Sequence, residues 1–206
     1  MNNKKITTLF LDIGGVLLTN GWGRQSRAKA ITQFNLDAEE MEERHHLTFD
    51  TYEEGKLTLH EYLNRVVFYE PRKFSHADFI AFMYGESIAL PGSIEFFKAL
   101  KERHQLRVIA VSNEGRELND HRIKTFKLDE LFDAFISSCY VHLRKPDRDI
   151  FQMAKDISQT APEHSLYIDD RSMYVEVAQS LGMNGLQFKS LEETKMALKV
   201  WGFEMG

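Results

Sequence analysis

The segment Leu9-Phe10-Leu11-Asp12-Ile13-Gly14-Gly15 decides how the rest of the chain is interpreted. Residues 6–11 are mostly aliphatic, aromatic or β-branched, a composition typical of a buried strand. A carboxylate, Asp12, ends this run, and Gly14 and Gly15 follow it closely. An acid between a buried strand and a glycine turn is well placed to be a nucleophile or a metal ligand. We therefore expect the first strand to deliver Asp12 to one edge of a sheet.

After residue 90 the sequence alternates between short apolar runs and helical patterns. The expected strands lie at 107–111, 134–138, 165–169 and 185–188, and the expected helices near 94–100 and at 115–126, 147–157, 172–181 and 191–201. Solid apolar strands that alternate with helices are typical of a parallel sheet covered on both faces. The sequence thus predicts an α/β fold with a Rossmann-like parallel sheet as its core.

A stretch near the N-terminus has a different character. Residues 16–87 carry helical patterns and no strand signal, and Thr58 and Glu61 form a capping box ahead of one of these helices. We interpret the stretch as an all-helical cap inserted into the core. The expected division is a core of residues 1–15 and 88–206 and a helical cap of residues 16–87.

Composition limits the possible functions. The chain of 206 residues has a net charge of −5 and no block of Lys and Arg, which argues against a nucleic-acid partner. Its one cysteine, Cys139, excludes an internal disulfide and favours a cytoplasmic location. No apolar run is long enough to suggest a membrane partner. A monomer and a homodimer are both compatible with these features.

Polar side chains follow the expected strands at the ends where ligands of parallel sheets bind. After the first strand comes Asp12; Ser112-Asn113, Lys145 and Asp169-Asp170 follow later ones. Three carboxylates placed together repel one another unless a cation lies between them, and oxygen ligands suit Mg²⁺. A serine before a helix N-terminus, together with a lysine, can bind phosphate. Asp12 could then attack the phosphorus atom.

These four stretches resemble the four motifs of the haloacid dehalogenase superfamily, in the family's order. The resemblance implies that Asp12 is the nucleophile, that Ser112 and Asn113 bind phosphate, and that Lys145 is the motif lysine. It also implies that Asp12, Asp169, Asp170 and the carbonyl of Gly14 bind the metal. The function implied is a Mg²⁺-dependent phosphatase that hydrolyses a small phosphorylated metabolite, such as a sugar phosphate, through an aspartyl-phosphate.

The sequence departs from the family pattern at two positions. Gly14 stands where family phosphatases usually have an Asp that acts as general acid and base, and Tyr174 stands where an Asp or Asn is usual. Members resembling the α-glucose-1-phosphate phosphatases share both the glycine and the paired aspartates, so the resemblance is to that helical-cap subgroup. Without the acid, the substrate is expected to have a good leaving group.

Two other functions remain open. A metal-free dehalogenase on the same fold would have no use for Asp169 and Asp170, and a non-catalytic phosphate-binding regulator would explain Gly14. A cap residue could also supply the missing proton. The candidates are His45, His46, Glu53 and His60, although a solvent-exposed helix face is the simpler interpretation of each.

Overall fold

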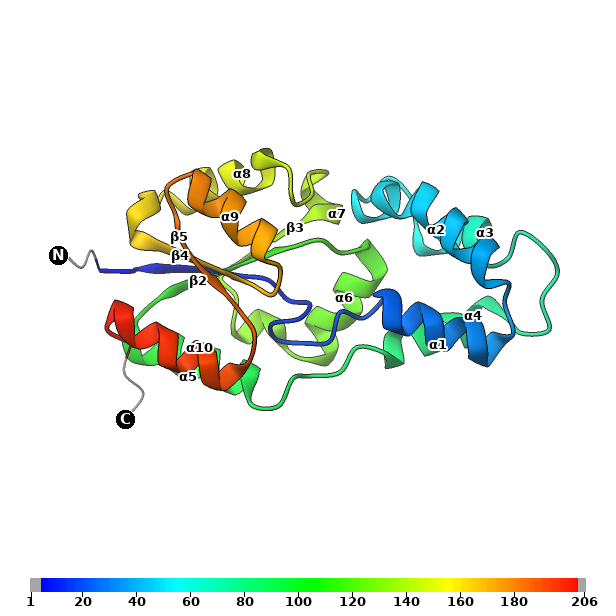
Figure 1. Cartoon of the computed structure of the whole chain (residues 1–206), viewed down its shortest axis with the longest axis horizontal. Helices are drawn as coiled ribbons and strands as arrows, with labels where there is room; N and C mark the ends of the chain where they lie inside the picture. Colours follow the sequence, from blue (N-terminus) through cyan, green and yellow to red (C-terminus); the bar gives the residue numbers. More distant parts are fainter. Residues whose placement is uncertain (1–4, 204–206) are drawn as a thin grey trace.

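The core of the protein is a five-stranded parallel sheet. The computed structural model describes residues 5–203 and is shown in Figure 1. The strands are β1 (Thr8–Leu11), β2 (Arg107–Ser112), β3 (Ala134–Ser137), β4 (Ser165–Asp169) and β5 (Asn184–Gln187). They are ordered β3-β2-β1-β4-β5, and every neighbouring pair is parallel. The predicted α/β fold is therefore confirmed, and β1 lies at the centre of the sheet.

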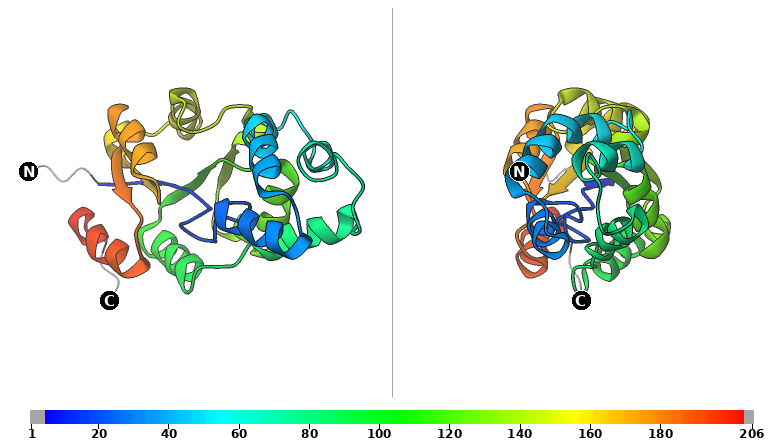
Figure 2. Two further views of the ribbon diagram at one scale, coloured as in Figure 1. Left: turned by 45° about the vertical axis from the view of Figure 1, so that its right-hand side comes forward. Right: turned by 90° about the vertical axis from the view of Figure 1, so that its right-hand side faces the viewer.

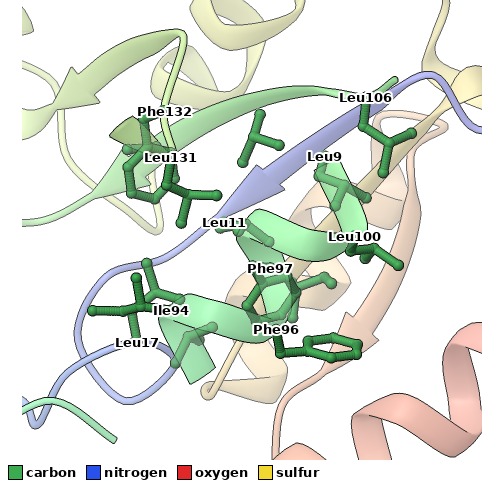
Figure 3. Close-up of a cluster of buried hydrophobic side chains, with 14 of the residues drawn as sticks. Leu9, Leu11, Leu17, Ile94, Phe96, Phe97, Leu100, Leu106, Leu131 and Phe132 are labelled. Atoms are coloured by element: carbon green, nitrogen blue, oxygen red, sulfur yellow. The ribbon is translucent and has the colours of Figure 1, made fainter. Parts of the chain in front are cut away.

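The buried strand β1 divides its side chains between two cores. Leu9 and Leu11 belong to the cluster on one face, whereas Phe10 belongs to the cluster on the other. This alternation is the period of two that an extended strand imposes. Figure 3 shows Leu9 and Leu11 facing Phe97 and Leu100 of α5 (Ser93–His104). The central strand is thus fixed from both sides, and so is the residue that follows it.

Helices cover both faces of the sheet (Figure 1). The longer ones besides α5 are α6 (Arg116–Thr125), α8 (Arg148–Ser158), α9 (Ser172–Ser180) and α10 (Leu191–Leu198). Short turns complete the core: η1 (Leu128–Glu130), α7 (Ser138–Val141), η2 (Pro162–His164) and η3 (Lys199–Trp201). The sequence had predicted a strand to residue 138, but α7 begins there instead. None of the helices within residues 5–203 combines the length and the apolar character that a bilayer crossing requires.

Four helices between β1 and β2 form a separate layer, which we call the helical subdomain. They are α1 (Arg24–Phe34), α2 (Ala38–Glu53), α3 (Leu59–Val66) and α4 (His76–Gly85). Their apolar faces meet in a third core, which includes Tyr62, Leu63, Phe79 and Met83. The predicted capping box of Thr58 and Glu61 is present at the start of α3. Figures 1 and 2 show the helical subdomain beyond one end of the sheet.

Both chain segments that lead into and out of the helical subdomain are bound to Arg122 of α6. Its guanidinium donates to the carbonyl of Thr19 (2.6 Å) and to Oγ of Ser87 (3.0 Å). The two segments also bind each other, because the amide of Thr19 donates to the carbonyl of Ile88 (2.8 Å). A buried ion pair with Glu114 holds the remaining end of the guanidinium. One side chain of the core therefore fixes both connections.

Candidate active site

Asp12, Lys145 and Asp169 form a buried charge cluster at the carboxyl edge of the sheet. The Nζ atom of Lys145 lies 3.1 Å from Oδ1 of Asp12 and 2.7 Å from Oδ2 of Asp169. Asp12 follows β1 and Asp169 ends β4, and these strands are neighbours in the sheet. The parallel register thus brings both carboxylates onto one lysine. Three of the residues expected from the sequence to share a site are placed together.

Lys145 is almost completely buried, which is unusual for a lysine. Its two carboxylate partners compensate for the loss of hydration. The side chain of Asn113 positions the main chain at this point: it accepts from the amide of Lys145 (2.8 Å) and donates to its carbonyl (2.9 Å). The side chain of Asn113, expected to bind phosphate, is therefore engaged in holding the lysine.

The third carboxylate, Asp170, completes a potential metal site. Asp12, Asp169 and Asp170 offer ligand oxygens that all lie within 4.8 Å of one another. The Oδ1 atom of Asp170 is buried and forms no hydrogen bond within the described residues 5–203. An unpartnered buried carboxylate oxygen beside two more carboxylates fits a hard divalent cation. The residues predicted to bind Mg²⁺ are thus compatible with that ion.

The pKa values at this edge reflect crowding of negative charge. Burial is the main reason that the pKa of Asp12 is raised to about 7; Lys145 opposes the rise, and repulsion from Asp169 contributes to it. Burial and the neighbouring Asp169 also raise the pKa of Asp170. Burial alone would lower the pKa of Lys145, but Asp12 and Asp169 outweigh it and raise that pKa. The lysine is therefore charged, and the positive charges of Lys145 and Arg171 only partly offset the crowding of the carboxylates.

Ser112 ends β2 next to Asp12 and is followed by the N-terminus of α6. A hydrogen bond from the Ser112 side chain lowers the pKa of Asp12, although burial dominates that pKa. Gly115 precedes the first turn of α6, and the ring of Tyr52 from α2 lies directly against it. The amides of a helix N-terminus attract anions. This arrangement is compatible with the phosphate-binding role expected of Ser112.

The space beside Gly14, where a second catalytic Asp would extend, is already filled. A β-carbon on Gly14 would lie 3.0 Å from Oδ1 of Asn20 and 3.8 Å from a guanidinium nitrogen of Arg122. Arg122 is in turn paired with Glu114, which is also buried. A side chain at position 14 would therefore begin against Asn20 and close to the guanidinium of Arg122.

A cavity of about 290 Å³ connects the charge cluster with the helical subdomain. The core contributes Asp12, Gly14, Ser112, Asn113 and Lys145, and the helical subdomain contributes Arg27, His45, Phe49 and Glu53, among others. Arg24 and Arg171 also line it, and neither side chain forms an ion pair within the part of the chain that the structure describes. The cavity thus offers an anionic ligand two arginines without a direct ion pair, although Arg171 interacts electrostatically with Asp170 and Arg24 with Glu42.

The structure distinguishes among the four residues of the helical subdomain that were candidates for supplying the missing proton. His45 lines the cavity and is buried, so its interpretation as part of an exposed helix face was wrong. Glu53 also lines the cavity and pairs with Arg144 (2.5 Å). His46 and His60 are exposed and do not line the cavity, and the ring of His60 stacks on that of His76. Only His45 and Glu53 therefore remain near the site.

Several residues of the cavity wall were missed from the sequence, among them Arg144, Arg171 and Trp22. Arg144 precedes Lys145 and pairs with Asp50 (2.7 Å) as well as with Glu53, which ties α2 to the core. Arg171 directly follows Asp170, and its position beside the acidic motif was the only available signal. Trp22 carried no such signal, because it reaches the cavity through the fold of the connecting segment.

A parallel sheet that gathers an aspartate, a lysine and a pair of aspartates at its carboxyl edge defines a class of α/β hydrolases. Residues 6–182 match the haloacid dehalogenase-like hydrolases. The protein belongs to this family, and the resemblance inferred from its four motifs is confirmed at the family level. The narrower resemblance to α-glucose-1-phosphate phosphatases is not established by these matches.

Similar proteins include a drimenol cyclase of Aspergillus calidoustus, 30% identical over 202 residues. The match covers 94% of this chain but 36% of the cyclase, so the chain spans about a third of that relative. A haloacid dehalogenase family enzyme of Bacteroides thetaiotaomicron has a similar structure, with a TM-score of 0.80 and 23% identity over 95% of this chain and 99% of its own. The L-2-haloacid dehalogenase of Xanthobacter autotrophicus aligns with a TM-score of 0.63 and 14% identity over 97% and 85% of the two chains.

Proposed function

We propose that the protein is a Mg²⁺-dependent phosphatase that hydrolyses a small phosphorylated metabolite through an aspartyl-phosphate on Asp12. The observation that carries the proposal is the cluster of Asp12, Asp169 and Asp170 around Lys145, with one buried oxygen of Asp170 unpartnered. A structure of the Bacteroides enzyme in complex with magnesium and inorganic phosphate, similar at a TM-score of 0.76, supports the same chemistry here.

In the proposed reaction, the carboxylate of Asp12 attacks phosphorus and the bond to the ester oxygen breaks, so that the alcohol departs as an oxyanion and takes its proton from water. Lys145 stabilises negative charge on the phosphoryl oxygens, and Ser112 and the amides at the start of α6 bind them. Water then attacks the aspartyl-phosphate, which releases inorganic phosphate and restores Asp12. A divalent ion held by Asp12, Asp169, Asp170 and the carbonyl of Gly14 would neutralise charge on the phosphoryl group.

The helical subdomain would act as a cap, corresponding to the proposed division of residues 16–87 from the core of 1–15 and 88–206. Support comes from the cavity, whose wall is built from both parts. The strand ends would hold the phosphate, so the remainder of the substrate would extend toward α1 and α2. A sugar phosphate is compatible with this polar cavity, as in the α-glucose-1-phosphate phosphatases that the sequence resembles.

A panel of phosphorylated metabolites assayed with Mg²⁺ and with a chelator tests the proposal. Hydrolysis should require the metal, and Asp12→Asn should fold normally yet lose turnover, because an amide is nearly isosteric but is not a nucleophile. Lys145→Ala should also be severely impaired. Halide release from 2-haloacids in the chelator would instead support a dehalogenase. Phosphate binding without turnover across the panel would support a non-catalytic regulator.

A further inference from the structure

His45 of α2 is held by a chain of buried hydrogen bonds that the proposed phosphoryl transfer does not use. The Nε1 atom of Trp22 lies 2.8 Å from the hydroxyl oxygen of Tyr62. That oxygen lies 2.6 Å from Nδ1 of His45. Tyr62 is fully buried and His45 is 8% exposed, so the bond between them is shielded from water. Such a series of bonds fixes proton positions as well as side-chain positions.

The chemistry of the three groups determines where the protons lie. An indole nitrogen only donates, so the hydroxyl of Tyr62 accepts from Trp22. Within the described chain, the other partner of this hydroxyl is His45, and its hydrogen is satisfied only if Nδ1 of His45 accepts it. A neutral imidazole that accepts at Nδ1 carries its proton on Nε2. Burial, reinforced by Arg27, lowers the pKa of His45 to about 4, so the ring is neutral at pH 7.

The ring of His45 is also held in orientation. It stacks on Phe49 with centroids 4.8 Å apart and planes 21° apart, and it meets Tyr62 edge-on. Its Nε2 atom forms no hydrogen bond within residues 5–203 and is not among the buried polar atoms that lack a partner. Because His45 lines the cavity, that solvent-accessible N–H is available to a ligand.

We infer that His45 is a specificity-determining residue whose Nε2–H donates to an oxygen on the leaving portion of the substrate. The inference rests on the proposed function, in which the strand ends hold the phosphate and the rest of the substrate faces the helical subdomain. The substrate class is a phosphate ester whose organic part carries hydroxyl or carbonyl oxygens. A neutral donor binds such an oxygen but does not protonate it, so His45 does not replace the missing acid.

Matched substrate pairs provide the kinetic test. Glycerol 3-phosphate and n-propyl phosphate share a three-carbon chain. Glucose 6-phosphate and cyclohexylmethyl phosphate both carry the phosphate on a CH₂ group attached to a six-membered ring. Only the first member of each pair offers hydroxyl oxygens. The native enzyme should prefer the hydroxylated member by about ten-fold or more in kcat/KM. His45→Phe keeps an aromatic ring but removes the N–H and should abolish this preference. His45→Gln, whose amide can donate near the Nε2 position, should restore part of it.

His46→Phe and His46→Gln are the matched controls, because His46 is adjacent in sequence but exposed and outside the cavity. Both should keep the native preference. An unchanged preference in His45→Phe would overturn the inference, as would native enzyme that favours the unhydroxylated members. A general loss of stability would lower the rates of both members together and leave their ratio intact.

The tautomer is tested without substrate or metal, so this result is independent of the proposed function. Long-range ¹H–¹⁵N spectra should show His45 protonated on Nε2 and unprotonated on Nδ1, unchanged between about pH 5.5 and 8. The signal is assigned by its absence in His45→Gln. The ionisable groups facing the ring are Arg27 from α1, Glu42 and His46 from α2 and Tyr62 from α3. An Nδ1-protonated or positively charged ring would overturn the assignment, and Tyr62→Phe should release the fixed tautomer.

Discussion

The ring of Tyr52 lies so close to Gly115 that a β-carbon on the glycine would be 2.0 Å from Cζ of the tyrosine. The helical subdomain and the first turn of α6 can meet only because residue 115 has no side chain. Gly115→Ala should separate them, lower the free energy of unfolding by about 1–3 kcal/mol and reduce kcat/KM. Urea titrations and steady-state kinetics measure both effects. Gly85→Ala is the control, because its β-carbon would meet nothing within 4 Å.

Removal of one proposed metal ligand should affect ion binding more than folding. Asp170→Asn retains size but loses the charge of the carboxylate whose Oδ1 is buried without a partner. We expect Mg²⁺ affinity, measured by calorimetric titration, to fall by at least about ten-fold. Thermal unfolding in a chelator should be unchanged or slightly improved, since carboxylate repulsion is relieved. Asp129→Asn, at an exposed turn, should alter neither quantity. Equal Mg²⁺ affinity in the native and Asp170→Asn proteins would exclude this metal site.

The glycine at position 14 should make the first chemical step sensitive to the leaving group. General acid catalysis contributes about 10²–10⁴-fold, so substrates that need no protonation should react faster by a comparable factor. Single-turnover rates for a series from alkyl phosphates to acidic aryl phosphates measure this dependence. A flat series would refute the explanation. Gly14→Asp should bring little gain, because its β-carbon would already meet Asn20 and lie close to Arg122.

The ion pairs of Arg144 should keep the helical subdomain close to the core. Arg144 pairs with Asp50 and Glu53 of α2, and burial raises the pKa of Glu53 despite the arginine. Arg144→Gln should lower the free energy of unfolding by about 1–3 kcal/mol and decrease kcat/KM. The double variant with Glu53→Gln should lose less than the sum of the single losses. Strict additivity would show that the pair is not coupled. Arg148→Gln, at an exposed position, serves as control.

His45 should make stability depend on pH in a defined window. Its pKa is lowered to about 4 from an ordinary value of 6.5 because burial penalises the charged ring. The unfolded chain therefore binds more protons between these values, and stability falls as pH decreases from 6.5 toward 4. His45→Gln should flatten this decline, by roughly 2–3 kcal/mol over the window. Urea unfolding at several pH values measures the difference, and parallel curves for the two proteins would contradict the assignment.

The sequence predicted the sheet well because its signals are local. All five predicted strands are present within two residues of their expected bounds; solid apolar runs mark the first four, because burial on both faces requires such runs. The one-turn helix α7 was missed because it directly continues an apolar strand and is too short to show a helical period. The strand order then brings the residues that follow these strands together, because β1 pairs with both β2 and β4.

The contents of the cavity wall were harder to predict because they depend on contacts between distant segments. His45 lies in a polar stretch, and only Trp22 and Tyr62, from other segments, make its position a buried one. The burial of Lys145 likewise depends on two aspartates that precede and follow it by many residues. Such arrangements leave no periodic trace in the sequence.

The guanidinium of Arg122 has a mechanical consequence. It binds Thr19 in the segment entering the helical subdomain and Ser87 in the segment leaving it, and these segments also bind each other. If one of the two connecting segments moved alone, several of these hydrogen bonds would break. If both segments rotated together, the bonds would be preserved. Arg122 thus couples the two connecting segments to each other and to α6. Because the same guanidinium also pairs with Glu114 in the cavity wall, a displacement of these segments would be transmitted to the wall of the cavity.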